Sequence, residues 1–485
     1  MRTGLRSAEG RWILAAAVLG SGAVFLEGTV VNVALPALAR DWGLGMDGVQ
    51  WVVNGYLLTL SALMLLGGAL GDVHPRGRVF ALGAFAFGGA TLAAALVPSF
   101  PLLVAARVAQ GTAGALLVPN SLALLEERFE GAERGAAIGR WAAWSAVSTA
   151  AGPFAGGWLV DALSWRWVFG AVAPFAFAAG WMALRKVPAA PRRGAARPVD
   201  YPGAALVTVA LGSLVATLVA APKLGMGDGR IVAGAAVGVA ALAGFVAREA
   251  RCAHPLLPLR LFRSRQFSAV NVATLLVYAA LGAVFLLLVL VLQNALGYTA
   301  FRSGLAILPL NAVMLLVSPV SGRVAGKIGP RAPMTAGALV CAGGLLLLGR
   351  LSPDAGYLRG VLPGLLVFAL GLSTLVAPLT AAVLGAVPDE FGGVASAVNN
   401  SVARVAGLLA TAALPALLGA AASETLAGAP LLDGFLRVMA VAAGLCVAGA
   451  AVTFLFVRGG AVVEHVPHPA PAQGCTQTRA KAAVE

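Results

Sequence analysis

The chain has 485 residues, of which 59% are hydrophobic and only 11% are charged, whereas a soluble protein carries about 25% charged residues. Since so few charges cannot cover the surface of a soluble domain, this composition excludes a water-soluble fold and favours a helix bundle in lipid. The net charge of +14 does not indicate nucleic-acid binding, because the basic residues fall in short clusters between long apolar segments.

Fourteen apolar stretches of about 20 residues are long enough to cross a bilayer as helices. They cover residues 12–36, 49–71, 79–97, 101–125, 141–160, 167–184, 202–221, 231–247, 268–293, 303–322, 332–349, 360–380, 393–419 and 438–457. The first stretch is too long, and too close to the others, to be a cleaved signal peptide. We therefore expect an all-α polytopic membrane protein with fourteen transmembrane helices.

The basic residues predict how the helices are oriented. With the N-terminus inside, 24 of the 34 Lys and Arg residues fall in inner loops and tails and 8 in outer loops. Because Lys and Arg prefer the cytoplasmic side of a membrane, we expect both termini to be cytoplasmic. The cell membrane is the expected location.

The two longest polar loops bracket the seventh and eighth stretches, which indicates an inserted helix pair between two sets of six helices. A short repeat supports this division: GGALGDVHPRGR (67–78) follows the second stretch, and SGRVAGKIGPR (321–331) follows the tenth. The expected parts are an N-tail (1–11), a first six-helix bundle (12–184), a linker (185–200), the inserted pair (201–247), a linker (248–267), a second six-helix bundle (268–457) and a C-tail (458–485).

Three charged residues lie inside the apolar stretches: Glu27, Arg107 and Arg404. A charge at mid-bilayer costs at least about 2.5 kcal/mol, so each needs a reason to be there. Glu27 and Arg107 lie at similar depth and could pair. A buried carboxyl beside an arginine can bind and release a proton as the arginine moves or a substrate enters, which suggests proton coupling. The alternative is a fixed ion pair that holds two helices together.

Several polar residues near these charges are candidates for a substrate cavity. Gln110 shares a helix face with Arg107, and Asn32 could line the same cavity or bond to a neighbouring helix. Arg404 could attract a carboxylate on the substrate, or it could bond to backbone carbonyls. The expected cavity residues are Asn32, Gln110, Asn399, Asn400 and Arg404.

The fifth stretch contains AAGPFAGGW (150–158), in which Gly152 and Gly156 are four residues apart and Pro153 can kink the helix. Small residues at this spacing let helix backbones approach closely. The pattern fits a seal between two halves that opens and closes, or a packing face and nothing more.

These stretches resemble the fourteen-helix drug:proton antiporter branch of the major facilitator superfamily. Four motifs carry the resemblance: LEGTVVNVALP (26–36), GGALGDVHPRGR (67–78), LVAARVAQGTAGALLVP (103–119) and AAGPFAGGW (150–158). The resemblance implies the major-facilitator fold, with two six-helix bundles and an inserted pair. This sequence departs from the family pattern at Glu27, where Asp is usual, and in the loop at Val73 and Pro75, where Arg and Gly are usual.

The resemblance also implies roles for particular residues. Proton coupling would fall to Arg107 together with Glu27. The antiporter motif would comprise Gly152, Pro153, Gly156 and Gly157, and the cytoplasmic gating loop would comprise Gly68, Asp72, Arg76 and Arg78.

The function expected from these features is proton-coupled export of small amphiphilic compounds such as antibiotics. A proton-coupled metabolite importer and a non-transporting receptor or scaffold are the alternatives. We expect no enzyme, because we find no nucleophile, metal or nucleotide motif, and the four cysteines lack metal-site spacing. No cofactor is expected besides the proton gradient. The expected partners are the bilayer and a neutral, zwitterionic or anionic small molecule, with no nucleic acid, and the chain is expected to be a monomer.

Overall fold

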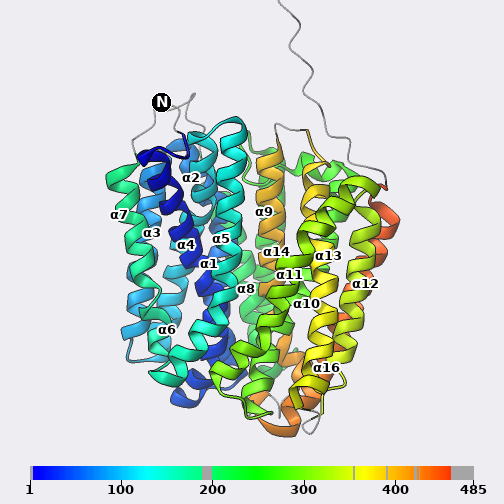
Figure 1. The fold of residues 1–485 in the computed structure, drawn as a ribbon. Coiled ribbons are helices and arrows are strands. Elements are labelled where there is room, and N and C mark those ends of the chain that lie inside the picture. The colour runs from blue at the N-terminus through cyan, green and yellow to red at the C-terminus, as the bar shows by residue number, and fades with distance from the viewer. Residues whose placement is uncertain are drawn as a thin grey trace, which may run out of the picture.

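The computed structural model describes residues 4–187, 199–352, 356–388, 391–419, 423–424 and 426–459. Within these ranges every regular element is a helix, and the long helices stand side by side as a bundle (Figure 1). Most of the predicted linker 185–200 and of the C-tail 458–485 lies outside the described residues.

Each of the fourteen predicted stretches falls mainly on helical residues, and the sixth, 167–184, covers two helices, Arg166–Gly170 and Ala173–Lys186. The helices are α1 (Ala8–Trp42), α2 (Met46–Val73), α3 (Arg76–Leu96), α4 (Phe100–Arg128), α5 (Gly131–Ala162), α6 (Arg166–Gly170), α7 (Ala173–Lys186), α8 (Tyr201–Leu224), α9 (Gly229–Arg251), η1 (Leu259–Arg263), α10 (Arg265–Asn294), α11 (Ala300–Ile328), α12 (Arg331–Leu348), η3 (Tyr357–Val361), α13 (Leu362–Leu384), α14 (Gly392–Leu418) and α16 (Gly428–Phe456). In the described part of the chain, 13 helical segments are long and apolar enough to cross a membrane, α6 and α7 counting as one. The remaining long helix, α5, is less apolar because Gly, Ser, Thr and Trp fill its middle. The predicted all-helical polytopic fold is confirmed.

The helices extend beyond the predicted stretches because polar residues cap them. Ser264 and Thr299 each accept a hydrogen bond from a backbone N–H in the first turn of α10 and α11. Asp228 caps α9, and hydrogen bonds from Arg230 lower the pKa of this carboxyl to about 2. Pro36 lies inside α1, and this helix ends at Trp42 with a left-handed Gly43 as its C-cap.

The helix contacts of α1–α7 recur in α10–α16. In the first group α2 contacts α4, α1 contacts α5, and α3 contacts α7; in the second group the corresponding pairs are α11 with α13, α10 with α14, and α12 with α16. Figure 1 shows the first group, blue to cyan, beside the second. We call the end where α1 begins and α2 ends the upper end, and the opposite end the lower end. Helix α16 also ends at the upper end (Figure 1).

The inserted pair, α8 and α9, contacts both groups through α8. One hydrophobic cluster joins Leu211 and Val215 of α8 to Ala62 of α2 and to Leu408 and Ala412 of α14. At the lower end an ion pair joins Lys223 Nζ of α8 to Asp47 Oδ2 of α2 at 2.9 Å. Helix α8 therefore lies across the seam between the two groups.

Candidate functional site

The centre of the first helix group contains a buried ion pair. Arg107 Nη1 of α4 lies 2.7 Å from Glu27 Oε1 of α1, and the side chains are 2% and 0% exposed. The structure thus brings together the two charges that the sequence places at similar depth. The second oxygen, Oε2 of Glu27, is buried and accepts no hydrogen bond in the described part of the chain. This oxygen is where a proton can be held without breaking the pair.

Two further acceptors and an aromatic ring fix the guanidinium of Arg107. Its Nη1 also donates to Gln110 Oε1 at 2.6 Å, and its Nε donates to the Val52 carbonyl at 2.9 Å. The ring of Tyr56 lies 4.4 Å from the guanidinium carbon, a cation–π contact. A guanidinium held on several sides has one orientation, so the approach of Glu27 is also defined.

Gln110 is held in turn by α3. Its Nε2 donates to Thr91 Oγ1 at 2.7 Å, and Thr91 donates to the Phe87 carbonyl at 2.6 Å. Gln110 and Thr91 are fully buried. The chain from Glu27 through Arg107 and Gln110 to Thr91 therefore links α1, α4 and α3 in one hydrogen-bonded network.

A central pocket of about 260 Å³ lies between the two helix groups beside this network. Asn32, Tyr56 and Arg107 line it from the first group, and Tyr278 and Asn311 line it from α10 and α11. Glu27 itself lies behind the wall, because it is not among the lining residues. A molecule in the pocket would contact Arg107 and could change its hold on Glu27.

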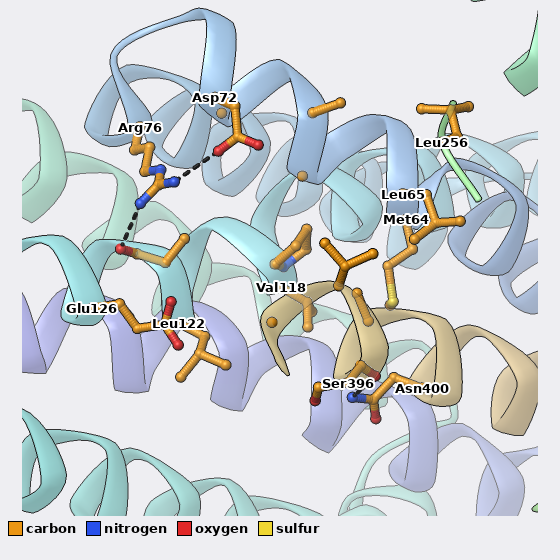
Figure 2. Close-up of a pocket in the computed structure, with 18 of the residues that line it drawn as sticks. Met64, Leu65, Asp72, Arg76, Val118, Leu122, Glu126, Leu256, Ser396 and Asn400 are labelled. Atoms are coloured by element: carbon orange, nitrogen blue, oxygen red, sulfur yellow. Dashed lines mark hydrogen bonds and ion pairs between the residues drawn. The ribbon is translucent and has the colours of Figure 1, made fainter. Parts of the chain in front are cut away.

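A larger cavity of about 2020 Å³ occupies the upper end. Figure 2 shows Met64 and Leu65 of α2 and Ser396 and Asn400 of α14 at its wall. Arg404 lines both the upper cavity and the central pocket. Within the described residues Arg404 has no ion-pair partner, so its charge is available to a molecule passing between the two spaces.

The turn between α2 and α3 lies on the rim of the upper cavity. Arg76 Nη2 pairs with Asp72 Oδ1 at 2.7 Å and Arg76 Nη1 donates to the Ala123 carbonyl at 3.2 Å, as Figure 2 shows. Gly68 and Arg78 line the same cavity. These contacts tie α2, α3 and α4 together at the upper end, all within the first helix group.

The glycines of α5 face two different neighbours. A Cβ on Gly152 would clash with Thr29 of α1, and a Cβ on Gly156 would clash with Val30. Gly157 instead faces the other helix group, where a Cβ would clash with the Ala300 carbonyl of α11. In return, a Cβ on Gly304 of α11 would clash with the carbonyl of Pro153.

The contact between α5 and α11 places the two helix groups against each other at the lower end. It is reinforced by the carboxylate of Asp161, which accepts hydrogen bonds from the backbone N–H groups of Ala300 and Phe301 at 3.1 and 2.8 Å. Since these N–H groups begin α11, the negative charge also suits the helix dipole.

Two other contacts join the groups at this end. Thr411 of α14 donates to Asn54 Oδ1 of α2 at 2.6 Å, and its carbonyl accepts from Gln50 Nε2. Gln293 of α10 donates to the Val33 carbonyl of α1 at 3.0 Å. The helix groups therefore meet at the lower end and enclose a cavity at the upper end.

Not every predicted cavity residue lines a cavity. Asn32, Asn400 and Arg404 do, but Gln110 and Asn399 are not among the lining residues of either space. Gln110 braces Arg107, and Asn399 Nδ2 donates to Asn271 Oδ1 and Thr274 Oγ1 of α10 at 3.2 and 2.8 Å. In this structure both residues are instead bonded to a neighbouring helix, Gln110 to α3 and Asn399 to α10.

Sequence reasoning missed three residues of the site: Thr91, Tyr56 and Asp161. A buried threonine in an apolar helix gives little signal. Asp161 comes directly after the fifth predicted stretch, four residues after Gly157, and this spacing could have marked it as a partner of the same contact.

Comparison with known proteins gives three findings. Residues 17–411 match the profile of the Major Facilitator Superfamily. The chain is 36% identical to the tetracenomycin C resistance and export protein of Streptomyces glaucescens, over 86% of this chain and 77% of the relative. It is also 36% identical to the puromycin resistance protein pur8 of Streptomyces alboniger, over 83% and 80% of the two chains.

Among solved structures, one similar fold is that of a bacterial homologue of the human lysosomal transporter Spinster in an inward-facing, unoccupied conformation. The TM-score is 0.67 at 15% identity, with 93% of this chain and 97% of that chain covered. At this identity the likeness concerns the fold alone.

Proposed function

The chain belongs to the major facilitator superfamily, and from this premise we propose that it is a proton-coupled antiporter that exports small amphiphilic compounds, antibiotics among them. The proposal is supported by relatives named for antibiotic resistance and export. The observation that carries it is the buried Glu27–Arg107 pair next to a pocket between the two helix groups.

In the proposed cycle, Glu27 carries the proton and Arg107 senses the substrate. While Arg107 holds Oε1 of Glu27, the carboxyl is stabilised in its charged form. A proton on Oε2 of Glu27 neutralises the carboxyl and weakens its attraction for Arg107. A substrate that contacts Arg107 in the central pocket favours the charged ion pair and therefore the release of the proton. Because Glu27 lies behind the pocket wall, proton and substrate compete through Arg107 and not by direct displacement.

The upper end is proposed to face the cytoplasm, in agreement with the excess of Lys and Arg in the loops on that side. The conformation described above is then the inward-facing one, open to compounds from the cell. Export requires the contacts at the lower end to break as the upper cavity closes. We place the protein in the cell membrane as a monomer.

The substrate is proposed to be neutral, zwitterionic or anionic. Two arginines, Arg107 and Arg404, line the central pocket, and among its lining residues in the described structure there is no carboxylate. A dication would be held there against two positive charges that water screens poorly. Arg404 could pair with a carboxylate on the substrate.

The test is expression in a pump-deficient bacterial strain, followed by growth on a panel of antibiotics and biocides with and without a protonophore. We expect resistance that the protonophore abolishes, and stronger protection against an anionic antibiotic than against a dicationic biocide. An Arg404→Gln variant should lose the protection against the anion. Resistance that is insensitive to the protonophore would contradict proton coupling, and protection against the dication alone would contradict the charge preference.

A further inference from the structure

Two acidic side chains are buried together at the upper ends of α8 and α9. Asp200, which caps α8, accepts hydrogen bonds at Oδ1 from the Gly203 N–H at 3.0 Å and from Arg248 Nε at 2.6 Å. Glu249 accepts at Oε2 from the Leu257 N–H at 2.8 Å. Asp200 and Glu249 are only 4% and 3% exposed.

The second oxygen of each carboxyl has no partner. Oδ2 of Asp200 and Oε1 of Glu249 are buried and accept no hydrogen bond in the described part of the chain. The two oxygens lie near each other, since a Cβ on Gly203 would be 2.5 Å from Oδ2 of Asp200 and 2.9 Å from Oε1 of Glu249, which places them at most 5.4 Å apart. Two unpaired carboxylate oxygens that are buried side by side repel each other and lack hydration.

One bound proton removes both the repulsion between the two oxygens and their lack of a hydrogen-bond donor. Arg248 balances the charge of Asp200, and a proton on Glu249 balances the other charge and supplies the missing hydrogen-bond donor. A metal ion fits less well, because in the described residues no group of three or more His, Cys, Asp or Glu side chains is arranged to hold one. We propose that Asp200 and Glu249 bind one proton between them, carried on Oε1 of Glu249 and donated to Oδ2 of Asp200.

This carboxyl pair joins three segments on the wall of the upper cavity: the start of α8, the end of α9 and the segment 252–258 that leads toward α10. The charged groups that act on Glu249 are Asp200 and Arg248, and Cys252 acts on Arg248. The other ionisable residues on the surrounding wall include Asp72, His74, Arg76, Arg78, His254, Arg260 and Arg404.

The proposed proton site makes the contacts of the inserted pair α8 and α9 depend on pH, a property that is separate from export. The proton is bound while the three segments are joined, and its loss leaves two like charges in contact. The joined form is therefore stable at low pH and is lost as the pH rises through the pKa of the pair. Release of Leu257 would then loosen the segment between α9 and α10.

The first experiment is infrared spectroscopy of the purified full-length protein, in the absence of substrate, at neutral pH. A protonated carboxyl gives a C=O stretch distinct from that of a carboxylate. All proteins carry Glu27→Gln so that Glu27 does not contribute. We expect the protonated band in this background, its loss in Glu249→Gln, and its retention in Glu126→Gln, which changes a partly exposed glutamate that pairs with Arg134 on the cavity wall. Absence of a band that depends on Glu249 overturns the proposal.

The second experiment is amide hydrogen exchange of the segment 252–258, corrected for the intrinsic exchange rate. The protection factor of the amide hydrogens in this segment should fall about tenfold per pH unit above the pKa of the Asp200–Glu249 pair, because one proton is lost. Glu249→Gln should stay protected at every pH, since its amide donates to Asp200 permanently. The same pH dependence in Glu249→Gln as in the unaltered protein overturns the proposal.

Gly203→Ala keeps both acidic side chains. It tests the shared proton if Glu249→Gln does not fold. The added methyl group separates the two oxygens, so protection should be low at all pH values and the protonated band should disappear. An unchanged band and unchanged protection in Gly203→Ala contradict a shared proton. Neither measurement needs a substrate or a gradient, so failure of this proposal and failure of the export function are distinguishable.

Discussion

At the residue scale, Glu27 and Arg107 divide two tasks. Arg107 uses its three hydrogen bonds and the Tyr56 ring to stay in place, whereas Glu27 keeps one oxygen without a partner. Breaking a buried pair by removing one partner costs about 3–5 kcal/mol, so a stable cycle has to exchange partners without leaving either charge alone. In the substrate-bound state the ion pair itself satisfies both charges. In the proton-bound state Glu27 is neutral, and Arg107 keeps its hydrogen bonds to Gln110 and to the Val52 carbonyl.

Glu27→Gln should abolish proton-driven export while the protein still folds. The glutamine Oε1 can accept from Arg107 as the carboxylate does, but it cannot bind and release a proton. Proton release on addition of substrate to proteoliposomes is the measurement. Glu424→Gln, which alters an exposed glutamate, is the control and should behave like the unaltered protein. Normal coupling in Glu27→Gln would refute the proton-carrier role.

Arg107→Lys should lower transport by about tenfold to a hundredfold, although it keeps the charge. An ammonium cannot reach Glu27, Gln110 and the Val52 carbonyl in the same planar arrangement, and a lost hydrogen bond to a charged group is worth about 1.5–3 kcal/mol. Uptake into inverted vesicles at saturating substrate gives the rate. Full activity with lysine would show that charge alone is sufficient.

At the element scale, α5 is the helix on which the lower end depends. Its glycines serve two contacts, since Gly152 and Gly156 pack against α1 and Gly157 packs against α11 of the other group. Asp161 then adds the hydrogen bonds to the start of α11. Helix α5 thus packs against α1 of its own group on one face. On another face it contacts α11, and in the proposed cycle this second contact must open.

Gly157→Leu should prevent closure of the lower end. Its side chain would meet Ala300 and Phe301, and overpacking of this kind costs about 1–3 kcal/mol in the closed form. A cysteine introduced at Asn311 in the central pocket should then react faster with an impermeant thiol reagent from the lower side. Gly139→Leu on the same helix is the control, because a Cβ there has open space. Equal labelling of both variants would contradict the role of Gly157.

At the scale of the whole molecule, the sequence predicts the helices better than the directions in which they face. Apolar length locates most of the helices, because every backbone group in lipid must be bonded within its own segment. The Glu27–Arg107 pair was predictable because buried charges are rare and two at one depth need each other. The positions of Asn399 and Gln110 were not, since helix rotation depends on partners such as Asn271 and Thr91 that lie on other helices.

Cross-linking the two helix groups at the lower end should stop transport reversibly. The rings of Phe154 on α5 and Phe301 on α11 have centroids 5.2 Å apart, so cysteines at both positions should be within reach of a short thiol cross-linker. The background should lack the native cysteines Cys252, Cys341, Cys446 and Cys475. Export should cease on cross-linking and return when the link is reduced.

The control for this experiment joins two helices of the same group. Cysteines in place of Phe85 on α3 and Phe177 on α7, whose rings lie 6.2 Å apart, should be cross-linked without loss of export. If both pairs block export equally, movement between the groups is not the cause. If the Phe154–Phe301 link leaves export intact, the lower end does not need to open.

Helix α8 covers one of the two seams between the helix groups, so the two lipid-facing sides of the protein differ. Leu57 of α2 lines the central pocket and also packs in the cluster with Leu211 and Val215 of α8. On this side α8 forms a second wall between the pocket and the hydrocarbon chains. On the other side, α5 and α11 expose Phe154 and Leu305 directly. A compound dissolved in the bilayer therefore faces a double barrier at one seam and a single barrier at the other.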